Sequence, residues 1–416
     1  MMSRRWGAWA LGRWAIGIVA LTSCSASQRP SGSASGRDSA GIAIIESPAP
    51  LWAAGHGWTV ADSPTVDLAG IGSPEAALRL SDGRIVVADG GPVGLRYFSR
   101  EGHPLYDVGR AGDGPAELRS IFQLDLAAAD TVAVYDLAQR TLFLFDPNGA
   151  LAGSVVVAES LAPRGTNGYL PKGITADGRY LLQQDEVAFP FAGAPGAILT
   201  DSTRLFWLSR QGRFTDSTSR LVAGELFGFE LEAGRGQRMV TPLARPLAPA
   251  LRVVTGGGMV WAGSGAAWEI LGYDAQGRAA RLLRIPRERV PLTPALRDSF
   301  ITRYRARVAG AAPLSVPSQL AEGIGAAPFS DRLPAYNELL AGEDSTLWVQ
   351  HVGLLEGLPG DASLVWTVFG ADGRWLGEVT MPPQFRPTAA GHGWILGLWR
   401  DPAGATHVRL FPLVER

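Results

Sequence analysis

Asp82-Gly-Arg-Ile-Val-Val-Ala-Asp89 carries the pattern that decides the fold of this sequence. Asp-Gly is a turn dipeptide because both residues tolerate a positive φ, and Ile-Val-Val is a run of side chains that favour β-strands. A turn followed by a short apolar strand recurs five more times, beginning at Asp130, Asp177, Gly257, Asp344 and His392. Repetition at roughly regular spacing predicts a protein built from similar β-units.

A second pattern, an apolar strand that ends in a glycine turn, follows five of the six copies. These strands begin at Leu95, Leu142, Leu205, Trp268 and Trp366. The sixth copy has only the strand 406–413 after it, but residues 64–75 are similar to residues 104–117, which close the first copy. We therefore predict an all-β fold, a six-bladed β-propeller in which an N-terminal strand closes the last blade. An open β-sandwich would explain the strands but not six phased copies.

Insertions interrupt the repeat at three places. Extra loops are expected near residues 185–202 in the third blade and near residues 353–362 in the fifth. The largest insertion covers about residues 286–333 and contains one predicted helix. Thr293-Pro294 is typical of a helix start, and apolar residues follow at every fourth position (Leu296, Phe300, Tyr304 and Val308). We expect this amphipathic helix to pack across the propeller surface.

The N-terminus has the features of a bacterial export signal. Basic residues precede an apolar run, residues 14–21, that is too short to span a bilayer. Leu21-Thr-Ser-Cys24 resembles the lipobox, in which the cysteine is acylated, and Cys24 is the only cysteine. We predict a lipoprotein signal peptide (1–23), an acylated Cys24 with a flexible tether (24–39), and the propeller (40–416). An ordinary signal peptide with an incidental cysteine is the alternative.

Composition excludes several classes of function. The formal net charge of −1 does not suit a protein that neutralises phosphates, so we expect no nucleic-acid partner. A single cysteine excludes an internal disulfide and a thiolate metal site. Ser25 rather than Asp follows Cys24, which in a bacterium with two membranes favours the outer membrane. The expected location is therefore extracytoplasmic and lipid-anchored, and we expect a monomer.

The first blade resembles the NHL repeat. The matching segments are residues 83–89, 95–98 and 109–115, and the later blades match less closely. The chain from about residue 40 to 416 is similar to the NHL-like six-bladed propeller lipoproteins of bacteria. Two short segments also resemble that group, Asp38-Ser-Ala-Gly-Ile42 and Leu333-Pro-Ala-Tyr-Asn-Glu-Leu339. This resemblance implies the fold but no particular function, because propellers include binding proteins, hydrolases and lyases.

The innermost strand of each blade would place polar side chains at the central axis. The candidates are Arg79, Gln123, Asp125, Lys172, Arg252, Asn337, Glu338, Arg386 and Thr388. Four of these strands offer cations and only two offer carboxylates, whereas a hard metal ion needs several carboxylate oxygens. We predict no metal and no cofactor, and a small anionic ligand bound by Lys172, Arg252 and Arg386 together with Asp125 and Glu338. The alternative is that these residues only form internal ion pairs.

Other polar residues are expected to be structural. Asp89, Asp136 and Asp185 follow second strands at matching positions and are predicted to cap the next turn. His351 and His392 lie beside strands, where a hydrogen-bonded histidine is the common case. No nucleophile motif is present. We therefore predict a cell-envelope lipoprotein that binds a small anionic ligand or a protein partner without catalysis. The alternative is an extracytoplasmic metal-dependent hydrolase or lyase resembling the gluconolactonase-type propellers.

Overall fold

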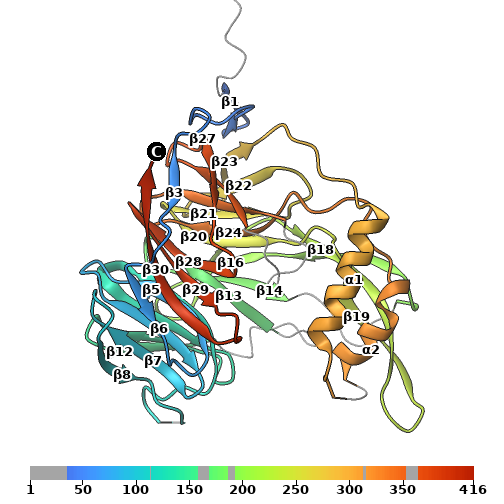
Figure 1. Cartoon of the computed structure of the whole chain (residues 1–416), viewed down its shortest axis with the longest axis horizontal. Helices are drawn as coiled ribbons and strands as arrows, with labels where there is room; N and C mark the ends of the chain where they lie inside the picture. Colours follow the sequence, from blue (N-terminus) through green and yellow to red (C-terminus); the bar gives the residue numbers. More distant parts are fainter. Residues whose placement is uncertain (1–34, 113, 158–167, 186–192, 313–314, 353–363) are drawn as a thin grey trace, which may run out of the picture.

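The structure is a computed structural model that describes residues 35–112, 114–157, 168–185, 193–312, 315–352 and 364–416 (Figure 1). These residues form thirty β-strands and two α-helices, which confirms the predicted all-β class. No helix among them is long and apolar enough to cross a membrane.

Six sheets follow one another along the described chain, and we number them I to VI. Sheet I contains β5 (Pro74–Arg79), β6 (Ile85–Gly90), β7 (Val93–Phe98) and β8 (Pro104–Val108). Sheet II contains β9 (Ile121–Ala127), β10 (Thr131–Asp136), β11 (Thr141–Phe145) and β12 (Leu151–Val156). Sheet III contains β13 (Gly168–Ile174), β14 (Tyr180–Asp185), β16 (Leu205–Leu208) and β17 (Phe214–Ser217).

The remaining three sheets repeat this order. Sheet IV contains β20 (Arg252–Gly256), β21 (Met259–Gly263), β22 (Glu269–Tyr273) and β23 (Ala279–Arg284). Sheet V contains β24 (Tyr336–Ala341), β25 (Leu347–His351), β26 (Val365–Phe369) and β27 (Trp375–Thr380). Sheet VI contains β28 (Phe385–Gly391), β29 (Trp394–Arg400) and β30 (Thr406–Glu415).

The first strands of the six sheets lie next to one another, and we call them the axial strands. Each of β5, β9, β13, β20, β24 and β28 contacts the axial strands of the preceding and following sheets, and β28 contacts β5. Apolar clusters fill the spaces between consecutive sheets. Between sheets VI and I, for example, Val66 and Leu68 pack with Ile85, Val87 and Leu396. The burial of these side chains is what holds the sheets face to face.

Segments before residue 70 join sheets that come late in the chain. β3 (Trp58–Val60) and β4 (Val66–Leu68) both pair antiparallel with β30. β2 (Ile42–Glu46) pairs with β23 in parallel, so it extends sheet IV, and β1 (Ser35–Ser39) pairs with β2. The expected tether over residues 24–39 is therefore wrong for Ser35–Ser39, because their backbone hydrogen bonds are made to β2. Cys24 lies outside the described residues.

A three-stranded sheet, called the side sheet below, combines a strand inserted between β14 and β16 of sheet III with two strands that follow sheet III in the sequence. It contains β15 (Ile198–Thr203), β18 (Leu221–Glu232) and β19 (Arg238–Ala244). The sequence predicted only an extra loop near residues 185–202. That prediction is wrong for β15, which pairs with β18. The two strands are not joined by a short hairpin turn, so no local sequence signal marks their pairing. Residues 186–192, and the predicted loop at 353–362, lie outside the described residues.

The insertion at 286–333 contains two helices rather than the predicted one. α1 (Pro294–Val308) begins as predicted, since Thr293 Oγ1 accepts a hydrogen bond from the Leu296 amide (3.3 Å). α2 (Val316–Gly323) begins in the same way at Ser315, but its eight residues are too few to give a clear apolar period. Phe300 of α1 packs with Phe227 of β18, so the helices cover the side sheet (Figure 1).

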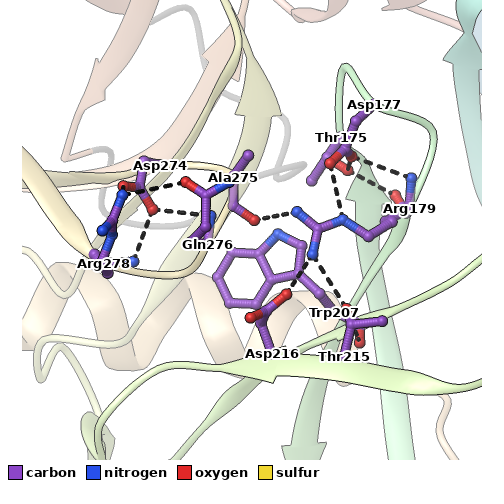
Figure 2. Close-up of polar contacts among 10 residues, drawn as sticks. All are labelled: Thr175, Asp177, Arg179, Trp207, Thr215, Asp216, Asp274, Ala275, Gln276 and Arg278. Carbon is purple, nitrogen blue, oxygen red and sulfur yellow. Dashed lines mark hydrogen bonds and ion pairs between the residues drawn. The ribbon is translucent and has the colours of Figure 1, made fainter.

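Arg179 shows why the Asp-Gly-Arg sequence recurs. Its Nε donates to Asp177 Oδ2 (2.9 Å) and its Nη1 donates to Asp216 Oδ2 (2.5 Å), which lies in β17 of the same sheet. Its Nη2 donates to the carbonyl oxygen of Ala275, in the turn between β22 and β23 of sheet IV (Figure 2). One guanidinium therefore fixes the turn after β13 and also joins sheet III to sheet IV.

Sheet I repeats this arrangement. Arg84 Nε donates to Asp82 Oδ2 (2.8 Å), and Arg84 Nη1 donates to the Tyr106 hydroxyl (2.9 Å) in β8. The Tyr106 hydroxyl donates in turn to the carbonyl oxygen of Pro147 (3.2 Å), in the turn between β11 and β12 of sheet II. Two of the three Asp-Gly-Arg copies, those at 82–84 and 177–179, thus contribute to the contact between sheets as well as to the turn.

Buried aspartates hold the loops that lead into the axial strands. Asp89 is fully buried, and its carboxylate accepts from the amides of Gly72 (3.3 Å), Ser73 (2.8 Å) and Gly91 (3.0 Å). Asp136 is also fully buried and accepts from three backbone amides of its own. The predicted capping role is confirmed for both residues, and the side chain of Asp185 lies outside the described part.

Candidate functional site

A cavity of about 600 Å³ lies among the axial strands, and residues of all six strands line it. We call it the axial cavity. Its polar side chains come from β9, β13, β20 and β28 and from the loops after β13 and β24. They are Gln123, Asp125, Lys172, Thr175, Thr255, Glu343 and Thr388. The cavity volume lies within the range of small-molecule sites, so it is the candidate site.

Lys172 is the cation in this cavity. It is half-buried on β13, and its side chain has no hydrogen bond or ion pair with any described residue. Burial lowers the pKa of its ammonium group, nearby Arg252 lowers that pKa further, and Glu338 raises it. A cation that is partly removed from water and has no bonded partner is stabilised by any anion that enters the cavity.

Arg252 and Glu338 lie beside Lys172 but do not line the cavity. Arg252 Nε is 3.6 Å from Glu338 Oε1, and the same Nε donates to the carbonyl oxygen of Asn337. Arg252 begins β20 and Asn337 belongs to β24, so this side chain links two neighbouring axial strands. Lys172, Arg252 and Glu338 thus form one charged group. These are three of the five residues that were predicted to bind a ligand together.

Arg386 is placed elsewhere. Its Nη2 donates to the carbonyl oxygen of Glu75 (3.0 Å), which links β28 to β5. Thr388 Oγ1 donates to the carbonyl oxygen of Ala77 (2.8 Å) and links the same two strands. Arg386 does not line the axial cavity and does not belong to the charged group around Lys172. Its hydrogen bond to Glu75 joins two axial strands.

Asp125 lines the cavity but pairs with none of the predicted cations. Its Oδ2 accepts from the side-chain amide of Gln123 (2.8 Å), two positions earlier on β9. Burial raises the pKa of Asp125 to about 6, and the hydrogen bond from Gln123 lowers it in part. The alternative interpretation, in which Asp125 forms an internal ion pair with an axial cation, is not what the structure shows. The reason is that Asp125 Oδ2 bonds to Gln123, on its own strand.

Glu343 was not among the predicted residues. It follows β24 and lines the cavity, and burial of its carboxyl raises its pKa to about 7. Arg79 lowers this pKa, and Asp130 and Asp344 raise it. The prediction searched only the residues before each turn, whereas Glu343 lies within the turn that follows β24.

Together these groups fit a hydroxylated anion. Lys172 can donate to an anionic group, and the Thr255 hydroxyl can donate or accept. The carboxyls of Asp125 and Glu343 can accept from ligand hydroxyls, but they would repel a second anionic group. The arrangement therefore suits a ligand that has one negative charge and several hydroxyl groups.

The described residues include no cluster of three or more His, Cys, Asp or Glu side chains that could hold a metal ion. His351 lies 2.8 Å from Thr367 Oγ1 and 3.5 Å from Glu378 Oε1, and burial lowers the pKa of its imidazole. His407 Nδ1 is 2.9 Å from Asp67 Oδ1. Each of these two histidines thus has a partner within its own sheet or on an adjoining strand.

No family model matches this chain. No curated relative matches it either. Among solved structures, a Bacteroides fragilis protein described as exported is 11% identical, with 90% of this chain and 99% of that chain covered and a TM-score of 0.45. A gluconolactonase from Xanthomonas campestris is 10% identical, with 86% and 97% covered and a TM-score of 0.41. A virginiamycin B lyase from Staphylococcus aureus is 11% identical, with 83% and 97% covered and a TM-score of 0.39. At these identities and scores the likenesses assign no activity to this chain.

Proposed function

We propose that this chain is a lipid-anchored protein of the cell envelope that binds a small hydroxylated anion, such as a sugar acid, in the axial cavity. The observation that carries the proposal is Lys172, a half-buried cation that faces the cavity without a bonded partner among the described residues. Natural proteins pair buried charges, so an unpaired ammonium at a cavity favours an external anion as its partner.

We also propose that sheets I to VI are the blades of a six-bladed β-propeller. The cycle of contacts between axial strands supports this arrangement, as do the apolar clusters between consecutive sheets. In this arrangement β4 completes the last blade beside β30, and the axial cavity lies on the propeller axis.

Replacing Lys172 with methionine should abolish ligand binding. At pH 7 and a hundredfold excess over its Kd, gluconate should raise the Tm of wild-type protein by about 4 °C, and glucose should not. Lys172→Met should show no gluconate shift, whereas Arg278→Met, which removes an exposed cation, should keep the whole shift. Because Lys172 must be protonated to bind an anion, affinity should fall as the pH rises through its lowered pKa.

The apo proteins provide a second readout. If Lys172 is an unpaired cation, Lys172→Met should stabilise the apo protein by about 1 kcal/mol, because a partly buried charge is removed. If Lys172 were instead half of a structural ion pair, the same change would destabilise the apo protein. An undiminished gluconate shift in Lys172→Met would also contradict the proposal.

The proposed anchor depends on Cys24. Replacing Cys24 with alanine should prevent acylation, so that the protein leaves the membrane fraction or keeps its leader. Fractionation followed by mass spectrometry of the N-terminus measures both outcomes. Normal cleavage with full retention in membranes would contradict the lipoprotein assignment, and Ser25→Ala serves as the matched control.

A further inference from the structure

A second pocket, of about 400 Å³, lies where the helical insertion meets the side sheet and sheet IV. We call it the arginine pocket, because three arginines contribute to its wall. Its lining residues are Val222, Gly224, Glu225, Arg245, Pro249, Ser264, Ala266, Arg289, Ser330, Asp331 and Arg332. It is distinct from the axial cavity and shares no lining residue with it.

Arg245 builds one wall, and each of its three side-chain nitrogens donates a hydrogen bond. Its Nη1 donates to Glu225 Oε2 (2.6 Å) in β18, so this charge is paired. Its Nε and Nη2 donate to the carbonyl oxygens of Pro328 (2.7 Å) and Phe329 (2.6 Å). Arg245 therefore fixes the end of the insertion against the side sheet and holds the pocket in shape.

Arg289 has no ion pair with any described residue, and Arg332 is paired only with the exposed Glu288. Arg289 donates to the carbonyl oxygens of Leu333 (2.8 Å) and Arg332 (2.6 Å) through Nε and Nη2, and these bonds orient the guanidinium without neutralising it. Arg332 Nη1 donates to the carbonyl oxygen of Arg289 (2.8 Å) and lies 3.4 Å from Glu288, whose side chain is 90% exposed. Burial and the proximity of Arg332 both lower the pKa of Arg289. Glu225 acts in the opposite direction and raises that pKa.

Two guanidiniums close together in a partly dehydrated pocket repel each other unless an anion lies between them. Among the described residues, no hydrogen bond is made by Arg289 Nη1 or Arg332 Nη2. Planar guanidinium groups bind carboxylate and phosphate oxygens with paired N–H donors. The wall also carries Asp331, but Glu225 is paired to Arg245 and Glu288 to Arg332, which leaves Arg289 without an ion pair among the described residues.

We propose that the arginine pocket binds the oxyanion group, a carboxylate or a phosphate, of a small ligand between Arg289 and Arg332. The pocket exists only because two segments that interrupt the repeat pack on each other through Phe227, Phe300 and Ile324. Ser264 lies in the same wall, and its hydroxyl can serve as a further donor, whereas the Ser330 hydroxyl already donates to the carbonyl oxygen of Arg332 (2.9 Å).

Calorimetric titration of the protein with inorganic phosphate and with N-acetylglycine, at constant ionic strength, tests the proposal. We expect saturable binding of at least one probe, and the preferred probe identifies which oxyanion the site takes. Arg332→Gln should weaken that binding at least tenfold. Arg289→Lys keeps the charge but loses the paired donors, so it should also weaken binding. Added chloride salt should reduce the affinity.

Two matched controls make the result specific. Arg297→Gln alters another arginine of the insertion that donates to a backbone carbonyl, that of Gly325, but lies outside the pocket lining, so binding should be unchanged. Lys172→Met should also leave binding unchanged, which separates this proposal from the axial one. No saturable binding of either probe would overturn the inference. So would full binding by folded Arg332→Gln, or loss of binding in Lys172→Met alone.

Discussion

Replacing Asp89 with alanine should lower the free energy of unfolding by about 4 kcal/mol. The carboxylate is fully buried, accepts from three backbone amides and lies 2.8 Å from Arg96 Nε. Removing it leaves these part-buried amides and the Arg96 guanidinium, whose side chain is 26% exposed, without their partner. Urea denaturation followed by tryptophan fluorescence measures the loss.

Asp372→Ala is the matched control for this substitution. Asp372 is a turn aspartate whose side chain is 58% exposed and which lies 3.4 Å from Arg374, so its loss should remain below about 1 kcal/mol. Asp89→Asn should be intermediate, because an amide oxygen can still accept from some of the backbone amides. Similar stabilities for Asp89→Ala and Asp372→Ala would show that the buried cap does not hold the loop before β5.

Removal of the chain through Gly70 should have the other large effect. This truncation removes β2, β3 and β4, and with them the buried side chains of Val60, Val66 and Leu68. Burial of three such side chains alone contributes about 5 kcal/mol. β30 would also lose its pairing partners and become an exposed edge that invites aggregation. Thermal unfolding with light scattering measures both effects.

Removal of the chain through Ala40 is the control, because β1 is the only described strand that it deletes, residues 36–39 of that strand are exposed, and the partners of β30 stay in place. We expect this truncation to unfold within a few degrees of the full-length protein. Equal Tm values for the two truncations would contradict the proposed completion of the last blade by β4. A large loss for the longer truncation alone would support it.

Local turn chemistry is the part of the fold that the sequence determined by itself. Asp82-Gly83 and Asp177-Gly178 need a residue that accepts a positive φ, and Gly83 (+92°) and Gly178 (+79°) adopt it. The strands that follow are runs of β-branched or aromatic side chains, so their positions could be predicted. The start of α1 at Thr293-Pro294 was predictable for the same reason, since a helix cap needs only neighbouring residues.

Sequence also found part of the candidate site. Lys172 and Asp125 lie just before turns on axial strands and line the axial cavity, whereas Arg252 and Arg386, which were chosen by the same rule, do not. Which partner each charge takes was not predictable. Arg252 and Arg386 donate to carbonyl oxygens of neighbouring axial strands, and those strands lie far away in the sequence.

Only the tertiary structure decided the long-range features. The side sheet forms because β15 pairs with β18, and the arginine pocket forms because the insertion then packs on that sheet. Glu343 acquires its raised pKa from burial and from Asp130, which is distant in the sequence, as well as from its neighbour Asp344. Turn and strand preferences act over a few residues, whereas burial and electrostatic interactions depend on which distant segments lie side by side, and that is set by packing of the whole chain.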